Sequence, residues 1–251
     1  METKEKTETI PGAVHGSASA GEPGAAGNAC RDDLYASRQR PADSPDWVLD
    51  LPQAQDVNVT QLFLVACRGM DRSTASVSLH QRDENGSWKL ILSTPGFVGK
   101  NGLCPDKTRV EGCGKTPLGI YRFNKAFGIA PDPGCALPYV QVDENDYWSG
   151  DDNQRYNEMV NLNDMPDLHT EQCEHLVDYA YEYRYCLNIS FNEDGTAGRG
   201  SAIFLHCLGR QNPYTGGCVS IPENIMRQVM QKVHEDCVVV IDTMENMNCP
   251  R

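Results

Sequence analysis

A histidine and a cysteine at the two ends of a short loop are the residues of this chain best suited to chemistry. His206 lies near the end of an apolar run over 201–208, and Cys218 directly follows Gly216 and Gly217. A cysteine thiol attacks carbonyl carbons once an imidazole within reach has taken its proton. Glycine before the cysteine lets backbone N–H groups approach a developing oxyanion. The loop therefore predicts acyl transfer, with Cys218 as nucleophile and His206 as general base.

The segment that follows Cys218 favours an ionised thiol. Residues 222–235 carry apolar side chains at helical spacing, and Pro222 suits the first position of a helix. A helix N-terminus and an imidazolium both lower the pKa of a nearby thiol. We therefore expect Cys218 to be a free thiol that is unusually reactive at neutral pH.

The residues before Cys218 are expected to build an oxyanion site. Gly217 and Cys218 would supply backbone N–H groups, and Thr215 would support the loop with a side-chain hydrogen bond. A plain turn at Gly216 and Gly217 is the structural alternative, and the two interpretations are compatible.

Both chemical residues also have structural alternatives. Any of the eleven cysteines could be bridged, and a histidine on an apolar strand is often a core residue with both nitrogens bonded. The glycine pair before Cys218 and the helix start after it favour the catalytic interpretation of the cysteine, and pairing with Cys218 favours that of His206. A third group should orient the other ring nitrogen of His206, and the sequence does not identify it.

These residues resemble the L,D-transpeptidase (YkuD-like) family of bacterial cell-wall enzymes, in which a strand histidine precedes a Ser/Thr-x-Gly-Cys segment. Residues 114–121, GKTPLGIY, resemble the family's Gly-Lys-Thr-Pro-x-Gly-x-Tyr/Phe segment. Residues 99–102, GKNG, resemble a glycine turn found before it in one branch. The three matches occur in the family's order and span roughly residues 60–245.

One position departs from the family pattern. Many members have an arginine two residues after the cysteine, where it helps to hold the substrate's carboxylate, and this chain has Ser220 there. Arg199 and Arg210 are candidate replacements. Thr116, within the second matching segment, would either shape the substrate cleft or belong to a turn that enters a strand.

The resemblance implies a mostly β domain with a packed helix, of β-sandwich type, that acts outside the membrane on peptidoglycan stem peptides without a metal or another cofactor. Cys218 would attack the carbonyl of the third stem residue, release the terminal D-alanine, and pass the acyl group to an amine of a second stem, forming a 3→3 cross-link. With water as acceptor the enzyme would be an L,D-carboxypeptidase. Carbapenem-type β-lactams would acylate Cys218.

A protein of another class is the alternative function. A non-catalytic wall-binding module would keep the fold and lose the chemistry, and Ser220 in place of arginine favours it. Retention of both His206 and Cys218 favours the enzyme.

Composition limits the partners and the compartment. The 251 residues suit one domain over 56–251 behind a disordered, low-complexity tether over 1–55. A net charge of −13 opposes binding to nucleic acid or anionic membranes, and no apolar run is long enough to span a bilayer. The N-terminus lacks the apolar core of a secretory signal, so we expect a mature or recombinant form whose export segment is absent.

The cysteine count predicts an oxidising, extracytoplasmic setting. Eleven cysteines without a C-x-x-C pair are unusual in a reducing cytosol, and ten of them could form five disulfides that leave one free thiol. The polar loop between Cys104 and Cys113 suggests that these two pair with each other.

Metal sites are weighed against simpler roles. His169, Cys173 and His175 lie close together, but their spacing fits no common zinc motif, and Cys173 is expected in one of the disulfides, so no metal site is predicted. The acidic residues of 143–146 and 151–152 are expected on a solvated face, with calcium binding left open.

Periodicity predicts the elements that hold the loop. Apolar patterns predict three antiparallel strands, followed by a long insertion over one rim of the sheet and a strand bearing a tyrosine ladder. His206 and its neighbour Cys207 should face opposite sides of their strand. His15, His80 and His234 are expected at the surface. The predicted strands are 61–68, 74–81, 88–92, 120–123, 139–142, 187–191, 201–208 and 237–242, the insertion is 143–175 and the ladder is 179–185.

Overall fold

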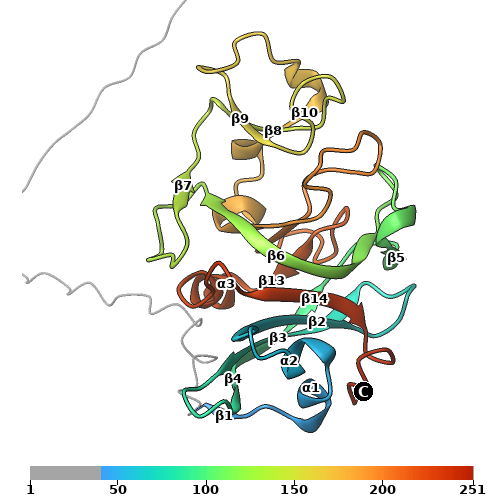
Figure 1. Cartoon of the computed structure of the whole chain (residues 1–251). Helices are drawn as coiled ribbons and strands as arrows, with labels where there is room; N and C mark the ends of the chain where they lie inside the picture. Colours follow the sequence, from blue (N-terminus) through green and yellow to red (C-terminus); the bar gives the residue numbers. More distant parts are fainter. Residues whose placement is uncertain (1–40, 251) are drawn as a thin grey trace, which may run out of the picture. The chain divides into compact units, whose positions relative to one another are not determined.

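Runs of apolar and β-branched residues form one large sheet in the computed structural model, which describes residues 41–250 (Figure 1). Each strand of the main ring pairs with the next, and the last strand also pairs with the first. The sheet therefore closes on itself. In ring order the strands are β4 (Trp88–Phe97), β13 (Val219–Ile221), β12 (Phe204–Cys207), β11 (Cys186–Ile189), β6 (Thr116–Gly128), β14 (Val238–Thr243), β2 (Gln61–Cys67) and β3 (Thr74–Arg82).

The prediction of a mostly β domain with a packed helix is confirmed. The three antiparallel strands expected first are β2, β3 and β4. The closed ring refines the expected sandwich, since the core lies inside one continuous sheet. Two short strands, β5 (Leu103–Pro105) and β7 (Tyr139–Gln141), pair with β6 in parallel, one near each of its ends.

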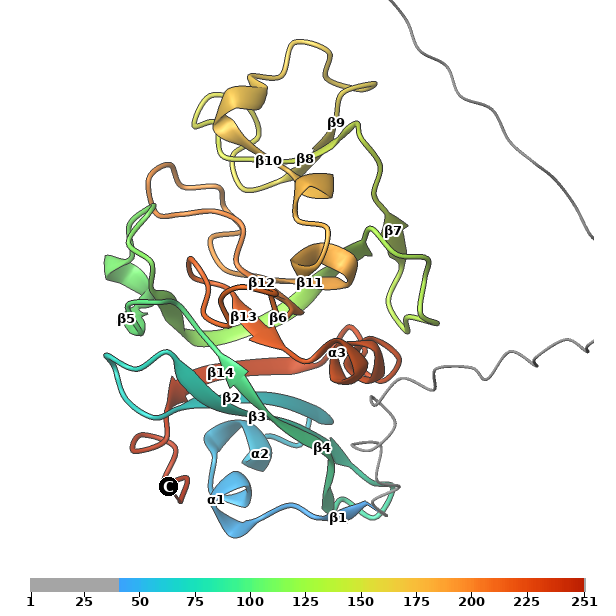
Figure 2. The same cartoon turned by 180° about the vertical axis from the view of Figure 1, so that it is seen from behind.

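The helix expected after Cys218 is α3 (Glu223–Met230), which begins after Pro222 and ends earlier than predicted. Its apolar stripe is buried: Met226, Val229 and Met230 are fully enclosed in the main core. Figure 2 shows α3 at one end of the ring, beyond β13. The helix therefore closes that end of the barrel.

Residues 41–55, which the sequence analysis assigned to the tether, are folded. They form β1 (Ala42–Asp43), α1 (Asp46–Leu49) and α2 (Pro52–Gln55), and Val48 and Leu51 are buried against the outer side of β2. The apolar residues of the two short helices explain this docking. The part of the tether at 1–40, which includes Cys30, lies outside the described residues.

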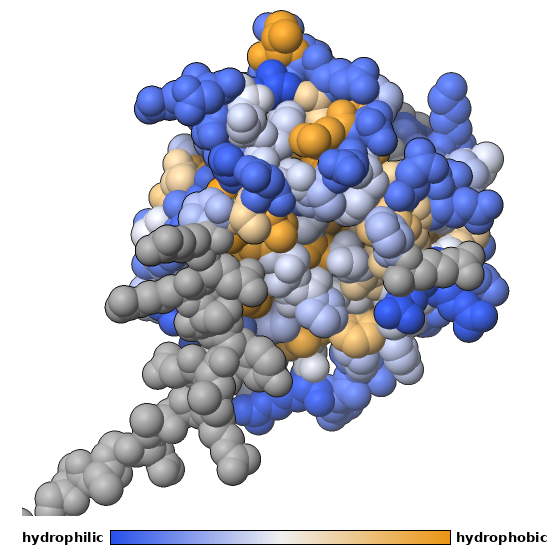
Figure 3. Space-filling model, turned by 90° about the horizontal axis from the view of Figure 1, so that it is seen from below, coloured by the Kyte–Doolittle hydropathy of each residue, from blue (hydrophilic) through white to orange (hydrophobic). Residues whose placement is uncertain are grey.

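The side of the domain that carries α1 and α2 has no single apolar area on its visible surface. Hydrophilic side chains surround smaller groups of hydrophobic ones there (Figure 3). Within the described part of the chain, no helix is both long and apolar enough to span a bilayer.

The prediction that His80 lies at the surface is wrong. His80 is buried where residues 41–55 meet the barrel. Its side chain is 1% exposed, and its ring nitrogens lie 2.8 Å from Ser44 Oγ and 2.9 Å from Ser78 Oγ. Burial lowers the pKa of His80 to about 4. The imidazole is therefore neutral in the folded protein and joins residues 41–55 to β3.

Acid should weaken the fold through His80. Its pKa is lower in the folded than in the unfolded chain, so its stabilisation is complete above pH 6.5 and is lost as the pH falls toward 4. We expect a loss of about 2 kcal/mol in the free energy of unfolding between pH 7 and pH 5. Urea unfolding at both pH values measures it, and the His80→Gln variant should lack most of this loss. An equal loss in both proteins would contradict the assignment.

The predicted insertion carries a small sheet of its own. Its strands, in the order β10 (Cys173–His175), β8 (Asp146–Ser149) and β9 (Met159–Asn161), are antiparallel, and the sheet lies beyond one side of the barrel (Figures 1 and 2). Trp148 anchors it, with its ring 4.7 Å from Phe204 of β12 and stacked 6.0 Å from Phe127 of β6. Short 3-10 turns also form in the described chain: η2 (Asp106–Thr108) lies between β5 and β6, η3 (Thr170–Gln172) lies in the insertion, and η4 (Leu176–Asp178) and η5 (Glu182–Arg184) follow it.

The histidines of the insertion bind carboxylates. His169 Nδ1 lies 2.6 Å from Asp151 Oδ2, whereas His175 contacts Asp178 at 3.0 Å. Asp146 accepts a hydrogen bond from the Asn161 side chain. Over residues 41–250, no group of three potential ligands is arranged to hold a metal ion.

The ten cysteines of the described chain are all free thiols, so the expected disulfides are not formed in this structure. Cys104 and Cys113 nevertheless lie close together: burial and then the neighbouring Cys113 raise the pKa of Cys104 to about 11. Their pairing stays a prediction, and it would close the loop that joins β5 to β6.

Candidate active site

Strand register brings His206 and Cys218 to the same side of the sheet. β12 and β13 run parallel, with His206 opposite Ser220, so Cys218 stands level with Phe204, two residues away from His206. At strand spacings, their Cα atoms are about 8 Å apart, within reach of the two side chains. Cys207 faces the opposite side, where it is 1% exposed in the main core. The predicted division between His206 and Cys207 is confirmed.

Both residues line one cavity of about 800 Å³ beneath the insertion. The loop over 209–217 forms one wall, and residues of η5 and the turn before it form another. Cys218 is the only cysteine of the described chain that lines this cavity. The remaining lining side chains that can carry charge are Lys100, Arg109, Glu111, Glu174, Glu182 and Arg210.

His206 is oriented by a backbone carbonyl. Its Nδ1 donates a hydrogen bond to Cys207 O at 2.8 Å, so this nitrogen carries the proton of the neutral ring. Burial lowers the pKa of His206 below its ordinary value. The imidazole is therefore neutral at pH 7, and its Nε2 lone pair is available to accept a proton. This carbonyl is the third group that the sequence could not identify.

Cys218 is a neutral thiol, contrary to expectation. Its Sγ donates to Ala202 O at 3.1 Å and accepts from Phe204 N at 3.3 Å, and the side chain packs with Phe204 under the insertion. Burial, followed by the charge of Glu174, raises the pKa of Cys218 to about 12. Strand β13 separates the thiol from α3, so the helix N-terminus does not offset these effects. Attack by Cys218 therefore requires removal of its proton.

Two threonines hold the shape of the loop over 209–217, which is called the nucleophile loop after the predicted role of Cys218. Thr215 Oγ1 donates to Cys218 O at 2.6 Å and accepts from Gly217 N at 3.1 Å, the kind of side-chain hydrogen bond expected for it. Thr116 Oγ1 donates to Gly217 O at 2.7 Å and accepts from Gly99 N at 2.9 Å. Thr116 is fully buried and does not line the cavity, so in this structure it positions the loop.

The same contacts revise the oxyanion site. Because the Gly217 amide already donates to Thr215, the Cys218 amide is the remaining donor of the predicted pair. Gly216 has open space around its Cα and lines the cavity. Gly99 forms a bridge with Thr215, so the three segments that resemble the family meet at this loop.

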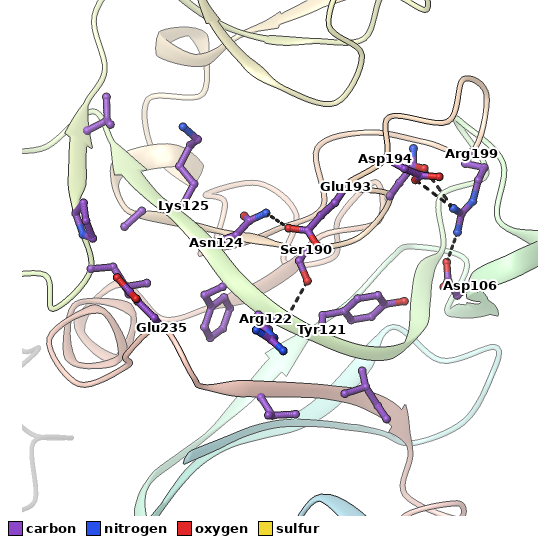
Figure 4. A pocket seen from close by; sticks show the side chains of 18 residues that line it. Asp106, Tyr121, Arg122, Asn124, Lys125, Ser190, Glu193, Asp194, Arg199 and Glu235 are labelled. Carbon is purple, nitrogen blue, oxygen red and sulfur yellow. Dashed lines mark hydrogen bonds and ion pairs between the residues drawn. The ribbon is translucent and has the colours of Figure 1, made fainter. Parts of the chain in front are cut away.

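The two predicted arginines lie in different places. Arg199 does not line the cavity of Cys218: it contacts Asp106 at 2.6 Å and Asp194 at 3.7 Å beside a separate cavity of about 1020 Å³ along β6 (Figure 4). Its charge is therefore neutralised elsewhere. Arg210 does line the cavity of Cys218, with its guanidinium 3.8 Å from the ring of Tyr181.

Ser220 does not replace the absent arginine. Its Oγ donates to Pro213 O at 2.6 Å, and the residue is fully buried. It thus fastens the loop over 208–217 to β13.

Three residues of the site were missed by the sequence analysis: Arg109, Glu174 and Tyr183. The Tyr183 hydroxyl donates to Glu174 Oε2 at 2.7 Å, and burial raises the pKa of Glu174. The tyrosine ladder is not a strand, because η4 and η5 turn the chain and send Tyr183 inward, 5.6 Å from the His206 ring. No local motif predicts these contacts, which depend on how the insertion packs.

Comparison with known proteins gives one family and several weaker structural likenesses. The model of the L,D-transpeptidase catalytic domain (YkuD) matches residues 71–241. No match was found among curated proteins.

Three solved structures are similar at low identity. They are the helical cell shape determining protein Pgp2 from Campylobacter jejuni (15% identity, TM-score 0.38, 79% of this chain and 54% of that one), an avibactam carbamoyl enzyme, Ldtfm (13%, 0.32, 74% and 49%), and a cysteine-to-serine mutant of the Enterococcus faecium L,D-transpeptidase (12%, 0.32, 73% and 49%). This chain therefore spans about half the length of each.

Proposed function

Because the chain belongs to the L,D-transpeptidase (YkuD) catalytic domain family, we propose that it is a cysteine acyltransferase that acts on peptidoglycan stem peptides outside the cytoplasmic membrane. The observation that carries the proposal is the cavity shared by a neutral His206, with Nε2 free to accept a proton, and the Cys218 thiol. Family membership supports the substrate class and the extracytoplasmic setting.

In the first half of the reaction, His206 Nε2 takes the Cys218 proton as Sγ attacks the carbonyl of the third stem residue. The Cys218 amide donates to the oxyanion. The C–N bond to D-alanine then breaks, and the imidazolium returns the proton to the departing amine. A thioester on Cys218 and free D-alanine are the products.

In the second half, an amine of another stem attacks the thioester while His206 takes its proton, and the thiol is restored as a 3→3 cross-link forms. With water as the acceptor, the product is a tripeptide stem and the activity is L,D-carboxypeptidase. Incubation of the full chain with a tetrapeptide stem, followed by mass spectrometry, distinguishes cross-linked dimers from trimmed monomers. Release of D-alanine is expected for both the L,D-transpeptidase and the L,D-carboxypeptidase activity.

A non-catalytic wall-binding module is the second candidate. Ser220 in place of arginine and the raised pKa of Cys218 favour it. Under this alternative, the wild-type chain would release no D-alanine and gain no mass from a carbapenem, yet would sediment with purified cell-wall sacculi. That combination of results would contradict the proposal that the chain is an enzyme.

The pH dependence of acylation should report His206. Its pKa is lowered by burial, so the unprotonated base persists below pH 6.5, and the acylation rate should fall only at more acidic pH. We expect a nearly constant rate of carbapenem acylation, followed by intact-protein mass, from pH 8 down to about 6.5. A half-maximal rate at or above pH 7 would contradict this role. The control is the His206→Gln variant, whose residual rate should lack this acid limb.

A further inference from the structure

Arg109 is a buried arginine beside the nucleophile loop. It follows η2 in the loop between β5 and β6, and it is only 4% exposed. Two backbone carbonyls fix its position: Nε donates to Lys115 O at 3.2 Å and Nη1 donates to Arg199 O at 2.9 Å. The guanidinium also lies 5.1 Å from the ring of Phe191. The side chain is therefore held in one place before any ligand binds.

Two glycines make room for this guanidinium. A Cβ added at Gly200, whose φ is +111°, would lie 1.3 Å from Arg109 Nη1. A Cβ added at Gly217 would lie 3.0 Å from Arg109 Nη2. Any larger side chain at either position would displace the arginine. The free end of the guanidinium thus lies against the residue that immediately precedes Cys218.

The charge of Arg109 has no counter-ion in the described chain. None of the ion pairs of residues 41–250 includes it, and Nη2 donates no hydrogen bond to another described group. The carboxylate of Glu111, which lines the same cavity, accepts hydrogen bonds from the Tyr156 hydroxyl at 2.6 Å and the Ser201 amide at 2.9 Å and forms no ion pair with Arg109. A buried, unpaired charge is costly, and an anionic ligand in the cavity would remove that cost.

The other charged groups of the cavity favour an anion position beside Arg109. Lys100 and Arg210 are exposed, and Arg210 is stacked on Tyr181, so neither is held against the nucleophile loop. Glu111, Glu174 and Glu182 line the cavity and would repel a carboxylate from their parts of the wall. An anion in the cavity is therefore directed toward Arg109.

We propose that Arg109 binds the terminal carboxylate of the residue that leaves when Cys218 attacks. In this chain Arg109 would then bind the carboxylate that an arginine at the position of Ser220 binds in many family members. The inference rests on the proposed function. It defines the donor substrate as a stem peptide with a free carboxylate one residue beyond the scissile carbonyl. Stems that end in an amide, or that extend by a further residue, would lose the contact.

The test compares a tetrapeptide stem with its C-terminal amide. For the wild-type chain we expect kcat/KM for release of the terminal residue to be roughly 30-fold or more higher with the acid. In Arg109→Met this preference should fall to nearly 1, and Arg109→Lys should retain part of it. The preference is a ratio within one protein, so a general loss of stability does not alter it. Arg210→Met is the matched control and should keep the wild-type preference.

The outcomes separate this inference from the proposed function. If the wild-type chain neither processes the stems nor is acylated by a carbapenem, the proposed function fails. If it is active but treats acid and amide alike, or if Arg109→Met keeps the preference, the role of Arg109 is overturned. Should Arg109→Met not fold, the comparison of the two substrates with wild type and with Arg109→Lys still decides.

Discussion

Replacing Cys218 with alanine should abolish acylation and turnover. Loss of a nucleophile that acts with its base lowers the rate on the order of 10⁶-fold in comparable enzymes. No other cysteine of the described chain reaches the cavity, so nothing there can substitute for the thiol. The checks are D-alanine release from a tetrapeptide stem and the intact mass after incubation with a carbapenem. The variant should release no D-alanine above background and show no mass gain.

Cys173→Ala is the matched control for this experiment. Cys173 is also a free, partly buried thiol, in strand β10 of the insertion, but it does not line the cavity. Its loss should leave both readouts at wild-type levels. If the Cys218→Ala variant forms a carbapenem adduct, or releases D-alanine at the wild-type rate, the nucleophile is a residue other than Cys218. Near-equal melting temperatures of the two variants would show that the loss is chemical.

Replacing His206 with glutamine should lower the acylation rate by about a hundred- to ten-thousand-fold. The reason is the state of the nucleophile: burial raises the pKa of Cys218 to about 12, so almost no thiolate exists at neutral pH without a base. Glutamine roughly preserves the shape of histidine but cannot take the proton. The initial rate of carbapenem acylation at pH 7.5 measures the effect.

The neighbouring Cys207→Ser variant separates chemistry from stability. Cys207 is packed in the main core on the other face of β12, and its Sγ donates one hydrogen bond, to the Tyr185 carbonyl at 3.8 Å. A buried hydroxyl there should cost about 1–3 kcal/mol of unfolding free energy and leave the acylation rate unchanged. The base assignment fails if His206→Gln acylates at the wild-type rate while folded Cys207→Ser does not.

The placement of His206 and Cys218 on one cavity could be predicted from sequence because it depends on local rules. A strand alternates its faces, which fixes His206 opposite to Cys207, and the glycines before Cys218 mark a loop. The orienting group of His206 is a backbone carbonyl, which any residue supplies. The amino-acid type at position 207 therefore gives no sign that its carbonyl orients His206.

The electrostatic state of the site could not be predicted in this way. The expectation of a thiolate at Cys218 relied on a nearby helix, but its burial under the insertion outweighs that effect. Arg109 reaches the nucleophile loop through tertiary packing on Gly200, far from it in sequence. Similarly, His80 carries no sequence sign of burial, because Ser44 lies in a segment that composition assigned to the tether.

Individual strands were predictable from apolar patterns and the fold class from the family resemblance, whereas the closure of the ring was not. An apolar run identifies β2 and alternation identifies β3, but neither says which strands lie beside them. The parallel pairing of β14 with β2 joins the two ends of the folded region.

That pairing makes folding of the barrel a late and long-range event. Strand β14 lies between β6 and β2, so neither neighbour has its full set of partners until residues 238–243 are in place. All seven residues of β2 are buried in the native state. In a chain that is still incomplete, this apolar strand would present an open edge to other chains. Newly made protein should therefore fold slowly and depend on a holding chaperone to escape aggregation until the last strand is inserted.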